Sequence, residues 1–125
     1  MSDAVRDPGE MLPLSASQLH ILLALADGEK HGYAVMREVE SMTDGEVTMG
    51  PGTLYGAVKK MVNLGLIEET DERPDPEMDD ERRRYYRTTG LGARVLEAEA
   101  TRLERLVKTA RSKQAGRLDP GLGTT

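Results

Sequence analysis

Apolar positions recur at helical spacing in four segments of the chain. In the first, residues 17–27, they cover most sides, which is typical of a helix buried in a small domain. Ser15 or Ser17 is suited to cap this helix, and Gly28 to end it. The second segment, residues 32–42, carries its apolar residues on one face: Val35, Met36, Val39 and Met42. Both segments predict helices.

The third segment predicts a helix that begins near Pro51 and closes at Gly65. At about 100° per residue its apolar residues gather on one side: Leu54, Ala57, Val58, Met61 and Val62. The other side is polar, cationic and small: Gly52, Thr53, Gly56, Lys59, Lys60 and Asn63. Proline suits the first turn, glycines allow close approach, and the unpaired N–H groups of the helix start attract phosphates. These features favour a helix that lies in the major groove of DNA.

Two short strand candidates follow the third helix. They are residues 66–70 and 83–88, and an acidic loop with two prolines separates them. The tyrosines of the second candidate favour a β conformation, so the two strands are expected to form a hairpin. Three helices followed by a hairpin is the order of a winged helix-turn-helix domain, here residues 14–88. The predicted fold class is mainly α with a small β-hairpin, preceded by a flexible arm over residues 1–13.

The fourth helical segment runs from Gly90 to about Lys113, with Thr89 as its cap. Its apolar residues repeat at spacings of four and three, the pattern of a coiled-coil seam: Leu96, Ala100, Leu103, Val107 and Ala110. About 24 residues span roughly 36 Å, too long for the rest of the domain to cover. We therefore expect residues 89–114 to form a dimerisation helix, and residues 115–125 to form a flexible tail.

Composition narrows the class of protein. The chain has 125 residues, which suits one domain, and no cysteine, which excludes disulfides and thiolate metal sites. No apolar run spans a bilayer and the N-terminus lacks a secretory signal, so a cytoplasmic location is expected. No catalytic motif is present, and His20 and His31 are isolated and more suited to capping or structural roles than to binding a metal. We expect neither an enzyme nor a cofactor.

The net charge of −5 is unevenly distributed. Residues 71–81 hold seven acids and one base, a local charge of −6; the other residues hold 16 bases and 15 acids, or +1. Residues 49–63 carry two lysines and no acid, and residues 82–87 carry four arginines and no acid. The acidic loop lacks the spacing of a calcium-binding loop, which favours a solvated loop whose tip avoids phosphates.

Four motifs together resemble the PadR family of bacterial transcriptional regulators. They are His31-Gly32-Tyr33, Pro51-Gly52-Thr53-Leu54-Tyr55, Gly65-Leu66-Ile67-Glu68 and Arg84-Tyr85-Tyr86-Arg87-Thr88-Thr89. The resemblance covers roughly residues 17–113. It implies that the chain is a homodimeric winged-helix repressor, of a family whose members often respond to small molecules. The chain is similar to the short members, which have one helix after the hairpin, or wing.

The chain departs from the family pattern at two glycines. Gly50 stands where the family usually has serine, so the helix lacks a capping hydroxyl that would stabilise it by about 1 kcal/mol. Gly56 stands where the family commonly has proline, and it weakens the helix interior by roughly 1 kcal/mol relative to alanine.

The third helix supplies the first group of candidate DNA contacts. Lys59 and Lys60 are suited to phosphates or a base edge, with a solvated helix face as the alternative. Thr53 offers a short hydroxyl and methyl beside Gly52. Tyr55 is expected either to hydrogen-bond a phosphate or to pack where the helix meets the hairpin.

The arginines before the second strand supply the next group. Arg82, Arg83 and Arg84 either bind phosphates or neutralise the acids at residues 79–81, although a surface ion pair is worth only ~0–1 kcal/mol. Tyr33, at the start of the second helix, either touches the DNA backbone or has a core or interhelical role.

The sequence as a whole favours a dimeric winged-helix regulator, most simply a repressor on a near-palindromic site in double-stranded DNA. The alternative is a winged-helix module that binds protein through its acidic loop. In the family, ligands often lie between the last helix and the first. Here those helices contain no aromatic residue, so an effector, if one binds, would be small and apolar.

Overall fold

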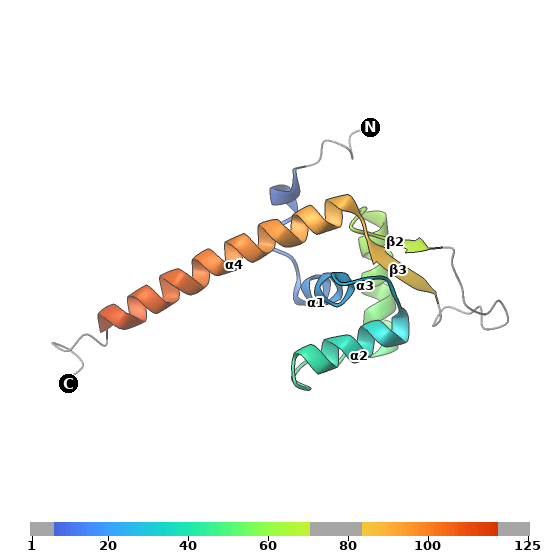
Figure 1. The fold of residues 1–125 in the computed structure, drawn as a ribbon, viewed down its shortest axis with the longest axis horizontal. Coiled ribbons are helices and arrows are strands. Elements are labelled where there is room, and N and C mark those ends of the chain that lie inside the picture. The colour runs from blue at the N-terminus through green and yellow to red at the C-terminus, as the bar shows by residue number, and fades with distance from the viewer. Residues whose placement is uncertain (1–6, 71–83, 118–125) are drawn as a thin grey trace.

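A computed structural model describes residues 7–70 and 84–117 of the chain (Figure 1). Its elements, in order, are η2 (Pro8–Met11), α1 (Ala16–Leu25), β1 (Lys30–His31), α2 (Gly32–Met42), α3 (Pro51–Asn63), β2 (Ile67–Thr70), β3 (Tyr85–Thr88) and α4 (Gly90–Arg117). The predicted fold class is confirmed, since the described residues are mainly helical with one small antiparallel sheet. No helix among them is long and apolar enough to cross a membrane.

The sheet has one strand more than the sequence predicts. Its order is β1-β3-β2, and both pairings are antiparallel. The expected hairpin is β2 with β3, in which Glu68 pairs with Arg87 and Glu69 with Tyr86. The added strand β1 has two residues, too few for any alternation of apolar and polar positions to be visible.

Local capping explains where the helices begin. Ser15 caps α1 in a capping box with Gln18, and the helix ends at Leu25, two residues before the predicted end. His31 caps α2, because its Nδ1 accepts a hydrogen bond of 3.2 Å from the Ala34 N–H. This confirms a capping role for His31. Gly50 precedes α3 and supplies no side-chain cap.

The core forms around α1, which packs against α2, α3 and α4. Its fully buried side chains include Ile21, Leu22, Val35, Leu54, Met61, Leu66, Ile67 and Val95. Two residues predicted on buried faces are exposed instead: Met42 of α2 and Val62 of α3 are each 38% exposed. Met42 is the last residue of α2, so little packs over it, whereas Val62 lies at the edge of the apolar face of α3.

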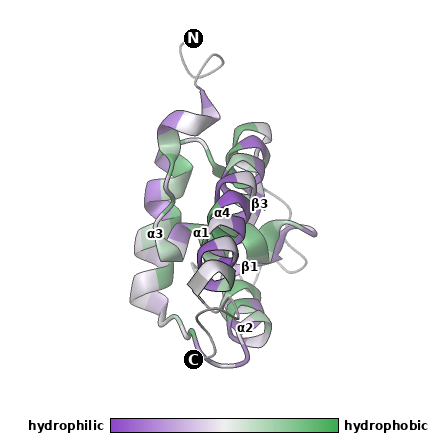
Figure 2. Ribbon diagram, turned by 90° about the vertical axis from the view of Figure 1, so that its left-hand side faces the viewer, coloured by the Kyte–Doolittle hydropathy of each residue, from purple (hydrophilic) through white to green (hydrophobic). Residues whose placement is uncertain are grey.

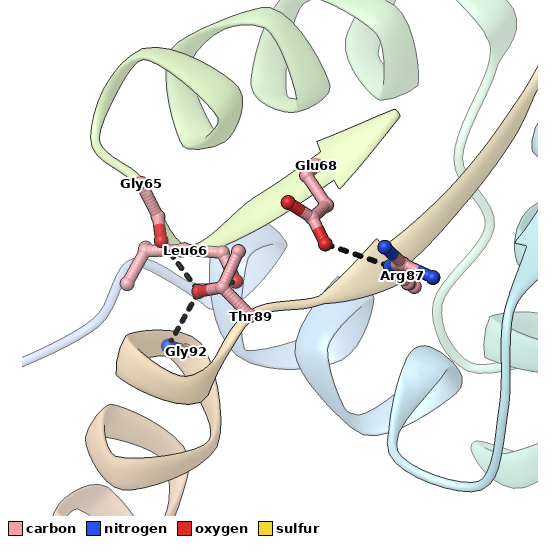
Figure 3. A network of polar contacts seen from close by, with 6 residues as sticks. All are labelled: Gly65, Leu66, Glu68, Arg87, Thr89 and Gly92. Atoms are coloured by element: carbon pink, nitrogen blue, oxygen red, sulfur yellow. Dashed lines mark hydrogen bonds and ion pairs between the residues drawn. The ribbon is translucent and has the colours of Figure 1, made fainter. Parts of the chain in front are cut away.

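The start of α4 is fixed to the loop between α3 and β2. Thr89 Oγ1 accepts from the Gly92 N–H at 3.0 Å and donates to the carbonyl oxygens of Gly65 and Leu66, at 2.5 and 3.1 Å (Figure 3). A Cβ atom at Gly92 would collide with the Leu66 carbonyl oxygen. The predicted cap is confirmed, and glycine is required at position 92 because the two backbones touch there.

A buried carboxylate joins α4 to the N-terminal segment. Glu99 is 1% exposed; it accepts from the Leu14 N–H at 3.1 Å and from Arg102 Nε and Nη2 at 2.6 and 3.0 Å. The hydrogen bonds from Arg102 hold the pKa of Glu99 below its ordinary value, although burial acts in the opposite direction. Residues 7–13, expected as part of a loose arm, instead contain η2, which packs against α4.

Beyond Leu103 the last helix leaves the domain. It continues to Arg117, four residues past the predicted end, and its C-terminal part projects away from the other elements (Figure 1). Hydrophobic and hydrophilic positions alternate along it (Figure 2). Residues 104–116 are all exposed, so this part of the helix has no cover within the described chain.

Candidate nucleic-acid interface

The outer face of α3 is an open, acid-free surface. All six residues predicted on it are exposed: Gly52, Thr53, Gly56, Lys59, Lys60 and Asn63. The opposite face buries Leu54, Val58 and Met61 in the core and so fixes the rotation of the helix. Cβ atoms added at Gly50, Gly52 or Gly56 would meet nothing within 4 Å. The first turn therefore presents backbone beside the small side chains of Pro51 and Thr53 to an approaching molecule.

The two lysines of α3 lie at opposite edges of this face. Lys59 lines a hollow of about 320 Å³ between α3 and the sheet, together with Asn63, Glu69 and Arg84. Lys60 lines a different hollow of about 450 Å³, whose other residues include Met11 of η2. The lysines share one exposed face but border different neighbours, as the helical rotation of about 100° between successive residues requires.

Tyr55 is placed by packing. Its hydroxyl oxygen is buried, and a Cβ atom at Gly32 would collide with it. This contact accounts for glycine at the first position of α2, and it places the Tyr55 hydroxyl against α2 rather than only where α3 meets the hairpin. Tyr33, in the same turn of α2, is half-buried.

Of the three candidate arginines, the structure describes Arg84; Arg82 and Arg83 lie outside the described residues. Arg84 Nε lies 3.3 Å from Glu69 Oε2, and its Nη1 lies 3.5 Å from Glu69 Oε1. Both side chains are partly exposed, at 42% and 33%. The partner is thus a strand residue across the hairpin, one that the sequence alone did not single out.

The sheet carries a second arginine–glutamate pair on its opposite face. Arg87 Nε lies 2.7 Å from Glu68 Oε2 (Figure 3). Glu68 and Glu69 are adjacent in β2, so their side chains point to opposite faces. On the face of Glu68, the ring of Tyr85 packs edge-on against His31 at 5.5 Å between centroids. The pair nearer α3 is the one that borders the candidate interface.

The predicted seam of α4 is only partly covered within one chain. Leu96 and Leu103 are half-buried, while Ala100, Val107 and Ala110 are exposed. Large apolar side chains are also exposed beside it, with Leu106 at 52%, Val107 at 49% and Leu23 of α1 at 42%. A hollow of about 310 Å³ lies between α1 and α4; its lining includes Leu23, Ala26, Leu96 and Ala100.

The fold and the exposed α3 define a winged helix-turn-helix domain. The chain belongs to the transcriptional regulator PadR-like family, whose model matches residues 21–98. The family consists of transcriptional regulators rather than enzymes.

Individual proteins resemble this chain in sequence or in fold. The chain is 34% identical over 90 residues to an uncharacterized 37.1 kDa protein in transposon TN4556 of Streptomyces fradiae; the match covers 72% of this chain and 24% of that protein, so the chain spans about a quarter of its length. A PadR family transcription regulator from Clostridium difficile R20291 has the same fold, with a TM-score of 0.65 at 22% identity, covering 80% of this chain and 99% of that one. Bacillus subtilis PadR in complex with operator DNA gives a TM-score of 0.58 at 20% identity, and the match covers 69% of this chain and 46% of that one.

Proposed function

We propose that this protein is a homodimeric repressor that binds a near-palindromic operator in double-stranded DNA. The single observation that carries the proposal is the outer face of α3, which is exposed, free of acids and nearly free of bulk in its first turn. A helix presented in this way fits the major groove, where side chains reach base edges. The operator complex of Bacillus subtilis PadR, which shares the fold, supports DNA as the partner.

The candidate residues of α3 have different roles in this proposal. Gly52 and the first-turn N–H groups approach the phosphate backbone, and Thr53 contacts a base or a phosphate. Lys59 and Lys60 bind phosphates on either side of the groove. Tyr55, whose hydroxyl is buried against Gly32, acts by holding α3 on α2 rather than by touching DNA itself.

The wing, which is the hairpin of β2 and β3, contributes phosphate contacts at its base. Arg84 borders α3, and Arg82 and Arg83 precede it in the chain. Tyr33, in the first turn of α2, is the remaining candidate for a contact with the DNA backbone. The negative charge of residues 71–81 disfavours contact between them and phosphates.

Pairing of two chains through α4 would cover the seam. The second copy then contacts Leu96, Leu103 and Val107, and the α3 helices of the two subunits reach successive major grooves about 34–36 Å apart. Binding of the dimer across a promoter in the cytoplasm blocks transcription. A small apolar effector, if one acts, would occupy the hollow between α1 and α4, where such pairing occurs.

The test is a gel shift with DNA from upstream of the gene, using wild-type protein and the Lys59→Ala, Lys60→Ala double variant. Wild type should retard specific fragments at physiological salt, and the double variant should bind more weakly with a shallower salt dependence, because each lost phosphate contact changes the slope by about 0.9. Unchanged affinity and slope in the variant would remove the lysines from the interface. Wild-type binding only at very low salt would favour a protein-binding module instead.

A further inference from the structure

The hollow between α3 and the base of the wing, called here the wing-root hollow, brings opposite charges around one space. Lys59 and Asn63 line it from α3, while Arg84 and Glu69 line it from the sheet. Val58 and Tyr86, both buried, form its apolar floor. Two cations and an amide beside an open hollow suit an anion, but the carboxylate of Glu69 occupies the same space.

The ion pair inside the wing-root hollow is looser than its counterpart on the other face of the sheet. Arg84 and Glu69 approach to 3.3 and 3.5 Å, whereas Arg87 and Glu68 reach 2.7 Å. Charge-assisted N–H···O bonds are typically about 2.7–2.9 Å long, so the Arg84 guanidinium is held close to Glu69 without an optimal bond. A phosphate oxygen with better geometry can therefore replace the carboxylate.

We propose that one backbone phosphate of DNA docks in the wing-root hollow on Lys59, Asn63 and Arg84, and that Glu69 competes with it for Arg84. This rests on the proposed function, because the hollow opens beside the face of α3 that enters the groove. In the free protein Glu69 holds Arg84 over the hollow. On binding, the phosphate takes that place and the Glu69 carboxylate turns to solvent. Glu69 thereby weakens binding to every DNA sequence by the same factor and leaves base recognition to α3.

Adjacent glutamates provide a matched pair of variants. Glu69→Gln and Glu68→Gln each remove one negative charge from the same strand, on opposite faces of the sheet. We expect Glu69→Gln to bind operator and random duplex DNA about three- to tenfold more tightly, and Glu68→Gln to stay within about twofold of wild type. The measurement is fluorescence anisotropy of labelled duplexes over a series of salt concentrations.

The arginines complete the test. Arg84→Gln should lower affinity and make the salt slope shallower by about 0.9 for each subunit bound, whereas Arg87→Gln should leave the slope unchanged. In the Arg84→Gln background, Glu69→Gln should have much less effect than in wild type, because its competitor role acts through Arg84. Circular dichroism melting shows that each variant is folded.

The outcomes separate this inference from the proposed function. Equal tightening by Glu68→Gln and Glu69→Gln means a general charge effect and overturns the role of Glu69. Specific wild-type binding that is insensitive to both Glu69 and Arg84 overturns the wing-root hollow while the proposed function stands. A wild-type protein that binds no duplex at physiological salt overturns both.

Discussion

The two halves of α4 have the same secondary structure and opposite surroundings. Residues 90–103 are fastened to the domain by the Thr89 cap, the backbone contact at Gly92 and the buried Glu99. Residues 104–116 are exposed throughout. Isolated helices shorter than about 12–15 residues are marginal in water. The first half is thus stabilised by its own chain, while the second needs something outside it, for which a second copy is our proposal.

The largest expected effect lies at the close backbone contact in the first half. Gly92→Ala forces a Cβ atom against the Leu66 carbonyl oxygen, so the helix must shift from the sheet. We expect a loss of about 3 kcal/mol in the free energy of unfolding, measured by urea denaturation. Gly116→Ala is the control in the second half, because nothing lies within 4 Å of its added Cβ. It should be neutral or slightly stabilising, and an equal loss in both variants would contradict the comparison.

The next effect concerns the carboxylates of the two halves. Glu99→Ala leaves the Leu14 N–H and the Arg102 guanidinium without their acceptor, so we expect a loss of about 2–3 kcal/mol in the free energy of unfolding. Glu104→Ala, on the exposed half, should stay within about 0.5 kcal/mol. A second readout is proteolysis of the N-terminal segment, which should become faster only in Glu99→Ala. Equal stability of the two variants would mean that Glu99 does not fasten η2.

How much the sequence could predict also differs along the molecule. The periodicity of residues 54–62 and the pair of glycines around Pro51 were enough to place α3 and its outer face. The two-residue strand β1 was missed because no pattern exists at that length. Glu99 was missed because one acid within an apolar stripe resembles a solvated position until its partners are known. Its one sequence signal was Arg102, three residues further along the same helix.

The candidate site was predictable in composition and less so in geometry. The acid-free face of α3 followed from residue types alone. The burial of the Tyr55 hydroxyl depended on Gly32, 23 positions away in the chain. Among the described residues, the partner of Arg84 is Glu69 of the facing strand. The first contact depends on how α3 packs on α2, and the second on the register of the hairpin, which the lengths of the strands do not determine.

The exposed half of α4 allows a test of association without loss of the monomer fold. Val107 is 49% exposed in the single chain, so Val107→Lys should leave the monomer intact while it places two charges in the proposed seam. We expect the dimer to dissociate about thirtyfold more readily, equivalent to about 2 kcal/mol. Analytical ultracentrifugation gives the dissociation constant, and Lys108→Ala, which lies off the proposed seam, is the control. A dimer as tight as wild type would place the interface elsewhere.

The smallest effect is a pH dependence confined to the first half. Because the pKa of Glu99 is lowered in the folded chain, folding favours its ionised form. Its contribution is complete above the pKa of the unfolded chain, about 4.3, and disappears as the pH falls through the lower folded value. The stability difference between wild type and Glu99→Gln should therefore be constant from about pH 7 to pH 5 and shrink below about pH 4.3. The total decrease should be ~1.4 kcal/mol for each unit by which folding lowers the pKa of Glu99. Urea denaturation at a series of pH values measures this stability difference, and Glu104→Gln should show no such change with pH. If the difference between wild type and Glu99→Gln instead grew toward acid pH, Glu99 would be protonated in the folded state.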